Sequence, residues 1–312
     1  MPLEAWALLA LVVAGGLVAG WFFVKRPLEV FAWFARRALR KAGLEKVVVP
    51  APAGPQTVFV GGSGPILVLL HGVGDNAGTW FHVARSLAAR YRLVIPDLAG
   101  HGESAPPAGP IPFTDLFGCL EAVVEQQAGG KRVTLVGNSL GAWLAMVFAA
   151  RHPERVERVV AVNGGPLMGS GGGPSLLPKT REEARDAMAR LRDPGSPAIP
   201  ANVLDDMVRR SSAGPIARFM GTAAGMGAWL LSEAQLRDVK TPIRLVWGVS
   251  DQLFPLEYAK RMAAVLPDVE LIPVERCGHI PQQEAAERFE AALLKALGNA
   301  PPSSTPPGGT AA

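Results

Sequence analysis

The chain has 312 residues, of which 49% are hydrophobic and 19% charged, and its formal net charge is +4. A chain of this length and apolar content can bury a sizeable core as one large domain or two small ones, which excludes a disordered protein. Cys119 and Cys277 lie far apart and lack metal-ligand spacing, so the sequence predicts free buried thiols and no metal site.

Residues 5–24 form the most hydrophobic stretch, which is 20 residues long and has no charge. A helix of this length spans about 30 Å, the thickness of a bilayer core, and Trp6 and Trp21 suit its two interfaces. A cleaved signal peptide is the alternative, but it expects a basic start and a shorter apolar core, and this chain starts Met-Pro-Leu-Glu. We therefore predict a single-pass transmembrane anchor over residues 1–24.

Positive charge is concentrated in residues 25–46, which hold seven Lys or Arg and two Glu, while the remainder is close to neutral. A basic belt confined to one stretch does not resemble a nucleic-acid surface, and the positive-inside rule places the residues after Lys25 on the cytoplasmic side. Apolar residues recur at helical spacing from Val30 to Ala38. This juxtamembrane pattern fits a helix in the membrane interface and, equally, a helix packed on the soluble domain.

Strand-like and helical patterns alternate after Pro50. The strand-like runs are 57–62, 66–72, 92–98, 132–139, 158–165, 243–248 and 269–275, and the helical patterns are 79–90, 114–127, 140–151, 257–265 and 282–297. This alternation predicts an α/β fold with a mostly parallel sheet and helices on both faces. The short turn between the first two runs predicts an antiparallel hairpin.

One segment breaks this alternation and predicts a cap insertion, 166–238, within a soluble domain of residues 47–298. Its methionines suit either a lipid-accommodating cleft or, more commonly, the cap's own small core: Met168, Met188, Met207, Met220 and Met226. Residues 299–312 are rich in Pro, Ser and Gly and are predicted to be disordered.

The stretch VTLVGNSLGAWLAM, residues 133–146, contains Ser139 in a G-x-S-x-G motif between Gly137 and Gly141. In a chain with 35 Gly such a motif is weak by itself. Here it follows a predicted strand and opens a predicted helix, as a strained nucleophile elbow requires. The positive end of that helix favours charge on the serine oxygen, so we predict that Ser139 is a nucleophile.

A serine nucleophile needs a base, and the base needs an orienting group. His152 lies at the end of the helix after the elbow, too near in sequence to return to it, whereas His279 follows the last strand. Asp251 follows the preceding strand, where by itself it would suit a turn or a helix N-cap. Because all three residues follow strands in the appropriate order, the sequence predicts a triad of Ser139, Asp251 and His279.

Donors for a developing oxyanion are predicted in LLHGVGDNAGTW, residues 69–80, and at the elbow. The flexible backbone at Gly72 allows the amide of Val73 to point into the site, and the amide of Leu140 supplies the second donor. His71 is predicted to support this loop by hydrogen bonding and not to act as a base.

Five segments now resemble the α/β-hydrolase superfamily in order and spacing over residues 56–297: LLHGVGDNAGTW, PDLAGHGES, VGNSLGA, WGVSDQLFP and CGHIPQQE. The resemblance implies an eight-stranded sheet, a helical cap, and Ser139, Asp251 and His279 as nucleophile, orienting acid and general base. It marks Asp97 and His101 as elements of a structural turn. Ala142 departs from the second glycine of many relatives.

With its anchor, the chain looks like the membrane-bound monoacylglycerol lipases, which implies hydrolysis of lipid-like carboxylic esters without a cofactor. The meta-cleavage-product C–C hydrolases are also similar, including a Gly-Asn-Ser elbow, but they act on charged products and are generally soluble. Ser139 excludes the haloalkane dehalogenases and epoxide hydrolases, which need an aspartate there. A non-enzymatic binding protein of the same fold is the third alternative, although such proteins typically lose a triad member.

Overall fold

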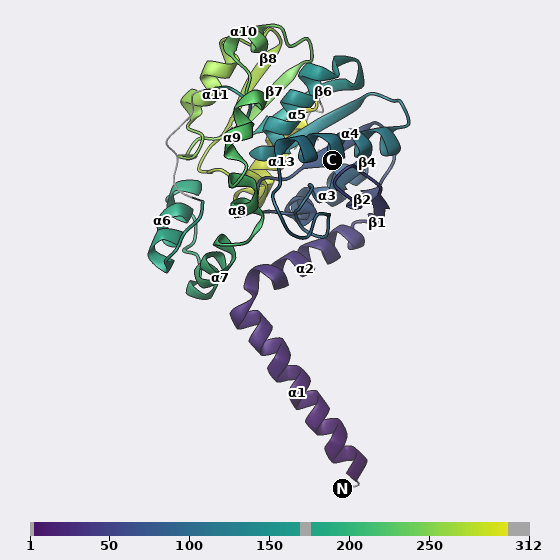
Figure 1. The fold of residues 1–312 in the computed structure, drawn as a ribbon, viewed down its shortest axis with the longest axis vertical. Helices are drawn as coiled ribbons and strands as arrows, with labels where there is room; N and C mark the ends of the chain where they lie inside the picture. Colours follow the sequence, from purple (N-terminus) through teal and green to yellow (C-terminus); the bar gives the residue numbers. More distant parts are fainter. Residues whose placement is uncertain (1–2, 169–175, 299–312) are drawn as a thin grey trace, which may run out of the picture.

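The computed structural model describes residues 3–168 and 176–298, and in these residues eight strands form one sheet (Figure 1). The strands are β1 (Glu45–Val49), β2 (Gln56–Gly61), β3 (Ile66–Leu70), β4 (Arg92–Pro96), β5 (Val133–Asn138), β6 (Val156–Val162), β7 (Ile243–Gly248) and β8 (Val269–Val274). Their spatial order is β1-β2-β4-β3-β5-β6-β7-β8. The two pairs that include β2 are antiparallel and the other five are parallel, which confirms the predicted mostly parallel eight-stranded sheet.

Helices cover both faces of the sheet, as predicted. Successive side chains of a strand point to opposite faces, so the apolar strands present side chains that must be buried on both. Leu67 and Leu69 of β3 join one buried cluster, and Val68 and Leu70 join the other. The first cluster is covered by α3 (Phe81–Ala88) and α13 (Ala286–Ala296), and the second by α4 (Phe113–Ala128), α5 (Leu140–Arg151) and α11 (Leu256–Ala263). Two short helices, η1 (Ala77–Trp80) and α12 (Pro281–Glu284), precede α3 and α13, and η2 (Pro153–Arg155) precedes β6.

The predicted hairpin of residues 57–62 and 66–72 is wrong. Strand β2 pairs with β1 on one side and with β4 on the other, and β3 lies beyond β4. Gly62 and Gly64, with φ of 76° and 106°, turn the chain between β2 and β3 without pairing them. The hairpin at the start of the sheet is instead made by β1 and β2.

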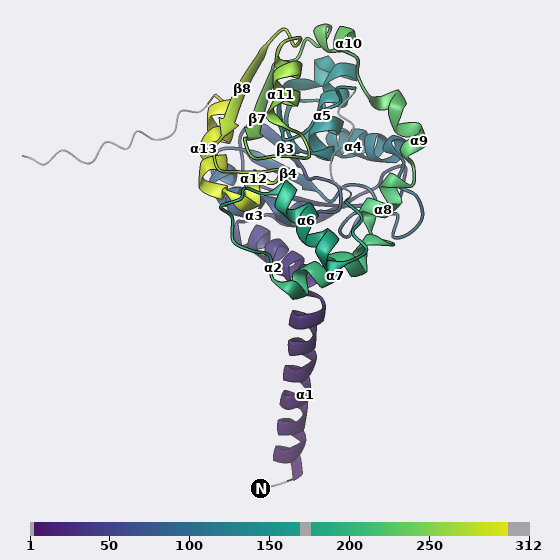
Figure 2. The same ribbon diagram turned by 90° about the vertical axis from the view of Figure 1, so that its left-hand side faces the viewer.

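Between β6 and β7 the chain leaves the sheet and forms a run of helices (Figure 2). These are α6 (Arg181–Leu191), α7 (Ala201–Ser211), α8 (Pro215–Met220), α9 (Ala223–Met226), η3 (Gly227–Trp229) and α10 (Glu233–Arg237). We refer to these helices as the cap helices. The domain boundaries predicted from the sequence stay predictions, and the predicted disordered tail, 299–312, lies outside the described residues.

The predicted single transmembrane helix is not supported. Among the described residues, no helix alone is sufficiently long and apolar to cross a membrane. Residues 10–25 and 27–41 meet the requirement only together, and they are bent by 102°. Pro27 causes a break there because proline lacks an N–H and disfavours helical geometry in the preceding residue. The chain therefore forms α1 (Leu3–Lys25), which extends from the body, and α2 (Pro27–Lys41).

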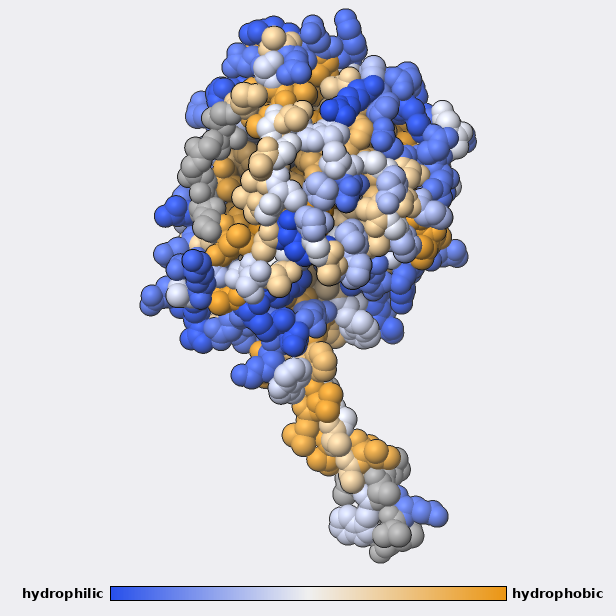
Figure 3. Space-filling view, in the orientation of Figure 1, coloured by the Kyte–Doolittle hydropathy of each residue, from blue (hydrophilic) through white to orange (hydrophobic). Residues whose placement is uncertain are grey.

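Helix α2 packs on the body of the protein, one of the two alternatives left open by its sequence. Ala35 and Leu39 are buried, and Leu39 belongs to the same cluster as α3 and α13. Phe31, Trp33 and Phe34 on other sides of the helix remain exposed. The amphipathic pattern thus serves the protein core and leaves an aromatic surface beside α1, whose apolar residues are visible in Figure 3.

Candidate active site

Ser139 stands at a sharp turn between β5 and α5. Its φ is 55° and its ψ is −115°, a sparsely populated conformation for a residue other than glycine. Gly137 and Gly141 leave room for the turn, because a Cβ on Gly137 would overlap the backbone carbonyl of Gly141. Gly164 approaches from β6 so closely that an added Cβ would lie 2.6 Å from the Ser139 Cα. This is the elbow geometry that the motif predicted.

Asp251 and His279, predicted as partners of Ser139, are joined by a hydrogen bond of 2.8 Å between Oδ2 and Nδ1. Both side chains are buried. The other carboxylate oxygen, Oδ1, accepts from the backbone amides of Leu253 at 2.8 Å and Phe254 at 3.0 Å. This arrangement leaves Nε2 as the ring nitrogen of His279 that is free to exchange a proton with the hydroxyl of a nucleophile.

Asn163 is a further partner of Asp251 that the sequence did not reveal. Its Nδ2 donates to Asp251 Oδ2 at 2.7 Å, and its Oδ1 accepts from the Gly248 amide at 3.0 Å. Asn163 is fully buried at the end of β6, and its φ is 47°. Only its position near the end of a predicted strand, directly before two glycines, indicated such a role. The residue fixes the carboxylate from the side opposite the backbone amides.

The loop that carries His279 is tied to the elbow. Asn138, which precedes Ser139, donates from Nδ2 to the His279 carbonyl at 2.9 Å. Gln282 donates from Nε2 to Asn138 Oδ1 at 3.2 Å, and the ring of Phe254 stacks on that of His279 with centroids 5.8 Å apart. These contacts bring Ser139 to the same edge of the sheet as Asp251 and His279, which lie far beyond it in the chain and are 28 positions apart. By contrast, His152 binds Glu121 on α4.

The predicted oxyanion donors flank Ser139. Gly72 lies against Ser139, since a Cβ on this glycine would be 3.3 Å from the Ser139 Cβ, and Val73 follows it. Leu140 is the first residue of α5, and the first N–H groups of a helix have no intrahelical acceptor. The two amides thus lie on either side of Ser139, that of Val73 in the loop after β3 and that of Leu140 at the start of α5.

His71 lies beneath this loop with both ring nitrogens engaged. Its Nδ1 is 2.8 Å from the Gly72 carbonyl, and its Nε2 accepts from the Leu98 amide at 2.9 Å. Burial lowers the pKa of His71 to about 4, which keeps the ring neutral. A neutral ring with both nitrogens occupied supports the loop and is not free to act as a base.

Asp97 and His101 lie in the turn after β4. Asp97 accepts from the Ala77 amide at 2.7 Å and the Glu103 amide at 2.8 Å, and Arg36 of α2 donates to it at 3.2 Å. Burial raises the pKa of this carboxyl despite these donors, and burial lowers that of His101 to about 3. Their partners are backbone groups of the turn and of η1 and the side chain of Arg36, consistent with a structural role.

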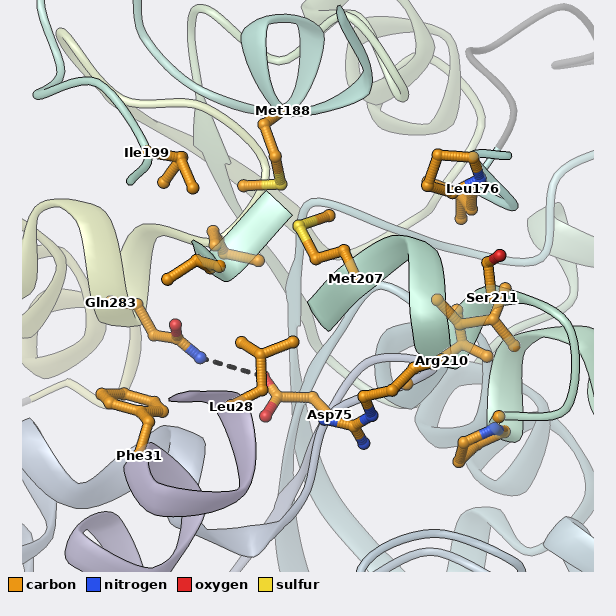
Figure 4. A pocket seen from close by; sticks show the side chains of 18 of the residues that line it. Leu28, Phe31, Asp75, Leu176, Met188, Ile199, Met207, Arg210, Ser211 and Gln283 are labelled. Carbon is orange, nitrogen blue, oxygen red and sulfur yellow. Dashed lines mark hydrogen bonds between the residues drawn. The ribbon is translucent and has the colours of Figure 1, made fainter. Parts of the chain in front are cut away.

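A cavity of about 510 Å³ lies beside these loops (Figure 4). Val73 and Asp75 border it from the oxyanion loop, and Ile280 and Gln283 border it from the loop after His279. Helix α2 and the cap helices α6, α7 and α8 form the other walls. Gln283 Nε2 donates to Asp75 Oδ2 at 2.9 Å, so the two loops are bonded at the edge of the cavity.

Of the five methionines in the predicted cap insertion, only two take the predicted position in a cleft. Met188 and Met207 line the cavity, whereas Met226 packs against the main core cluster. Met168 and Met220 are exposed. In the described part of the chain no group of three or more His, Cys, Asp or Glu is arranged to hold a metal ion, and Cys119 and Cys277 are free and buried.

The parallel sheet with a serine at the elbow after β5, and with Asp and His after β7 and β8, defines a class of hydrolases. The model of the alpha/beta hydrolase family matches residues 67–292, and the chain belongs to this family.

The proteins similar to this chain include a dienedioate hydrolase, a membrane phospholipase A and an esterase. A 2-hydroxy-6-oxononadienedioate/2-hydroxy-6-oxononatrienedioate hydrolase of Paraburkholderia phymatum is 30% identical over 256 residues, covering 74% of this chain and 86% of the relative. The crystal structure of a membrane phospholipase A, a bacterial virulence factor, is 25% identical with a TM-score of 0.73, and the match covers 94% of this chain and 99% of that one. A thermophilic esterase from Thermogutta terrifontis shares the fold, with a TM-score of 0.67, 21% identity and coverage of 81% and 98%.

Proposed function

We propose that this hydrolase is a membrane-associated serine esterase that cleaves lipid-like carboxylic esters through Ser139, Asp251 and His279. The observation that carries the proposal is the hydrogen bond of 2.8 Å between Asp251 and His279, in a site whose elbow holds Ser139 at a φ of 55°. This is the arrangement that a serine nucleophile needs, because a serine hydroxyl is a poor nucleophile without an oriented base.

In the proposed mechanism Ser139 Oγ attacks the ester carbonyl while His279 Nε2 takes its proton. The resulting oxyanion accepts hydrogen bonds from the amides of Val73 and Leu140. His279 then returns the proton to the departing alcohol, and a serine acyl ester remains. Water, deprotonated by His279, attacks this ester; the acyl–Oγ bond breaks, the acid is released, and His279 returns the proton to Ser139 Oγ. Asp251 keeps Nδ1 protonated throughout and stabilises the charged ring.

Association with a membrane is proposed from the apolar surface of α1 and α2. Leu11 and Leu17 are each 71% exposed, and Trp21, Phe34 and Trp33 continue the apolar surface to α2. The likeness to a membrane phospholipase A supports this part of the proposal. A flotation assay with liposomes tests it: the full chain should float with the vesicles, and a chain that begins at residue 25 should remain mostly below them.

Turnover of p-nitrophenyl butyrate tests the chemistry. The wild type should hydrolyse it and react with a fluorophosphonate probe, and Ser139→Ala should lose both properties while retaining its melting temperature. If the wild type hydrolyses no ester and does not react with the probe, the esterase proposal fails.

C–C bond hydrolysis is the second candidate, favoured by the 30% identity to the dienedioate hydrolase. Because both reactions require Ser139, the Ser139→Ala variant cannot distinguish them. A direct comparison of a monoacylglycerol with a 2-hydroxy-6-oxo-dienedioate as substrates separates the two chemistries. A kcat/KM that is higher for the dienedioate would replace the ester proposal with this one.

A further inference from the structure

One wall of the cavity beside the oxyanion loop comes from outside the five segments that resemble the α/β-hydrolase superfamily. Pro27, Leu28 and Phe31 of α2 border it, together with Val203 and Met207 of α7. Its volume of about 510 Å³ falls in the range of small-molecule sites. The N-terminal segment therefore shapes a cavity that begins one residue from His279.

Helices α2 and α7 are bonded across this wall. Asp206 of α7 is buried and accepts from the Leu28 amide at 3.0 Å, although the two residues are 178 positions apart. Arg209 donates to Glu29 at 3.0 Å and also pairs with Asp206. An acceptor at the start of α2 satisfies an amide that the helix itself leaves unpaired. These bonds hold the two walls at a fixed separation.

The charged residues of the cavity lining balance one another. Arg192 lies 4.0 Å from Glu284, and Arg210 lies beside Asp75 (Figure 4). The described lining therefore holds two arginines and two carboxylates and carries no net formal charge. The remaining surface is formed mainly by aliphatic, Met and Phe side chains, which favour a neutral hydrocarbon.

The cavity also approaches the exposed apolar surface of the chain. Pro27 and Leu28 stand at the bend where α1 joins α2, and the exposed residues Trp21, Phe22 and Phe23 of α1 lie directly before it. A hydrocarbon chain in the cavity would thus extend from the ester carbonyl, at Val73, toward the segment proposed to contact lipid.

We propose that this cavity binds the hydrocarbon chain of a single-chain amphipathic ester, and that Leu28 of α2 and Met207 of α7 set the longest chain accepted. The inference rests on the proposed esterase function. Each methylene that enters the cavity contributes about a fourfold increase in kcat/KM, so activity rises with chain length until the cavity is full.

The test measures kcat/KM of the full-length protein in detergent for p-nitrophenyl esters from four to sixteen carbons. Leu28→Trp and Met207→Trp each fill part of the cavity from a different wall. We expect both variants to reach their optimum at a shorter chain. A loss of four buried methylenes lowers kcat/KM for the longest chains by about 200-fold relative to kcat/KM for the four-carbon ester of the same variant.

Leu11→Trp on α1 is the matched control, because Leu11 is 71% exposed and away from the cavity; this variant should keep the wild-type profile. If both cavity variants hydrolyse the four-carbon ester and the chain length of highest kcat/KM does not change, the proposed site for the hydrocarbon chain is wrong and the proposed esterase function stands. If the wild type hydrolyses no ester of any length, both proposals fail. Since the two substitutions lie on different elements, a folding defect in one leaves the other as the test.

Discussion

Replacing Asp251 with Asn separates the orienting role of this residue from its contribution to folding. In the wild type all four neighbours of the carboxylate are donors: the Leu253 and Phe254 amides on Oδ1, and Asn163 and His279 on Oδ2. An asparagine has only one oxygen. Whichever way its amide is turned, the NH2 group faces two former donors.

One orientation of the new amide costs less than the other. With the oxygen toward the two backbone amides, which cannot change their role, the NH2 group faces Asn163 and His279. Asn163 cannot exchange its own amide groups without losing the bond from the Gly248 amide. The imidazole can adapt, because Nδ1 becomes an acceptor when its proton moves to Nε2. His279 would then present a proton to Ser139 and could not accept one.

The expected magnitudes differ clearly between activity and stability. A triad histidine held in the wrong tautomer lowers kcat by about 10⁴-fold, as known for another serine hydrolase. The unpaired donor of Asn163 costs about 1–3 kcal/mol of folding free energy, which lowers the melting temperature of a domain this large by about 2–4 °C per kcal/mol. The folded fraction at 25 °C therefore remains near one.

The assay is hydrolysis of p-nitrophenyl butyrate under single-turnover and steady-state conditions, with a thermal melt of each protein. Asp186→Asn, in the exposed part of α6, is the matched control and should leave both measurements unchanged. If folded Asp251→Asn keeps more than a tenth of the wild-type kcat, Asp251 does not orient the base and the reasoning is refuted.

Three further predictions concern stability. Gly137→Ala should yield no folded protein by circular dichroism, because its Cβ overlaps the backbone of Gly141; an unchanged melting temperature would contradict this reading of the elbow. The pKa of Asp75 is raised by burial to about 6 from an ordinary 3.8, so the contribution of this carboxyl to stability is lost as the pH rises from about 4 to about 6. The melting temperature of Asp75→Asn relative to wild type should therefore increase over this range, and a constant difference would show that the carboxyl is not perturbed. Burial lowers the pKa values of His71 and His101 to about 4 and about 3. The two histidines therefore contribute stability that is present above about pH 6.5 and is lost as the pH falls toward those values. In thermal melts from pH 7 to pH 4, this loss of stability should be smaller for His101→Gln than for the wild type.

The sequence predicted most of the sheet because buried parallel strands leave a strong local signal. Strand β1 was missed, since its sequence, EKVVV, begins with two charged residues that close the basic segment. Three of its five residues are exposed, so it lacks the continuous apolar pattern of an inner strand. The false hairpin followed from this omission, because the true partner of β2 was unknown.

The candidate site was predictable where function depends on the order of residues along the chain, and not where it depends on contacts between distant segments. Ser139, Asp251 and His279 follow strands whose ends meet at one edge of a parallel sheet. Asn163 contacts Asp251 only because β6 and β7 are neighbours in that sheet. The contribution of α2 to the cavity depends on its bend, which Pro27 marks in the sequence, and on the bond between Leu28 and Asp206, which has no local sequence signal.

The packing of α2 divides the N-terminal region at Arg26. Arg36 of this helix reaches the buried carboxylate of Asp97, and Leu39 is wholly enclosed. Proteolytic release after Lys25 would therefore shed α1 and leave the cavity proposed to bind substrate intact. Cleavage a few turns later would open the protein interior to water. The N-terminal region is therefore two parts: α1, which we expect to be dispensable for folding, and α2, whose Ala35 and Leu39 belong to the protein interior.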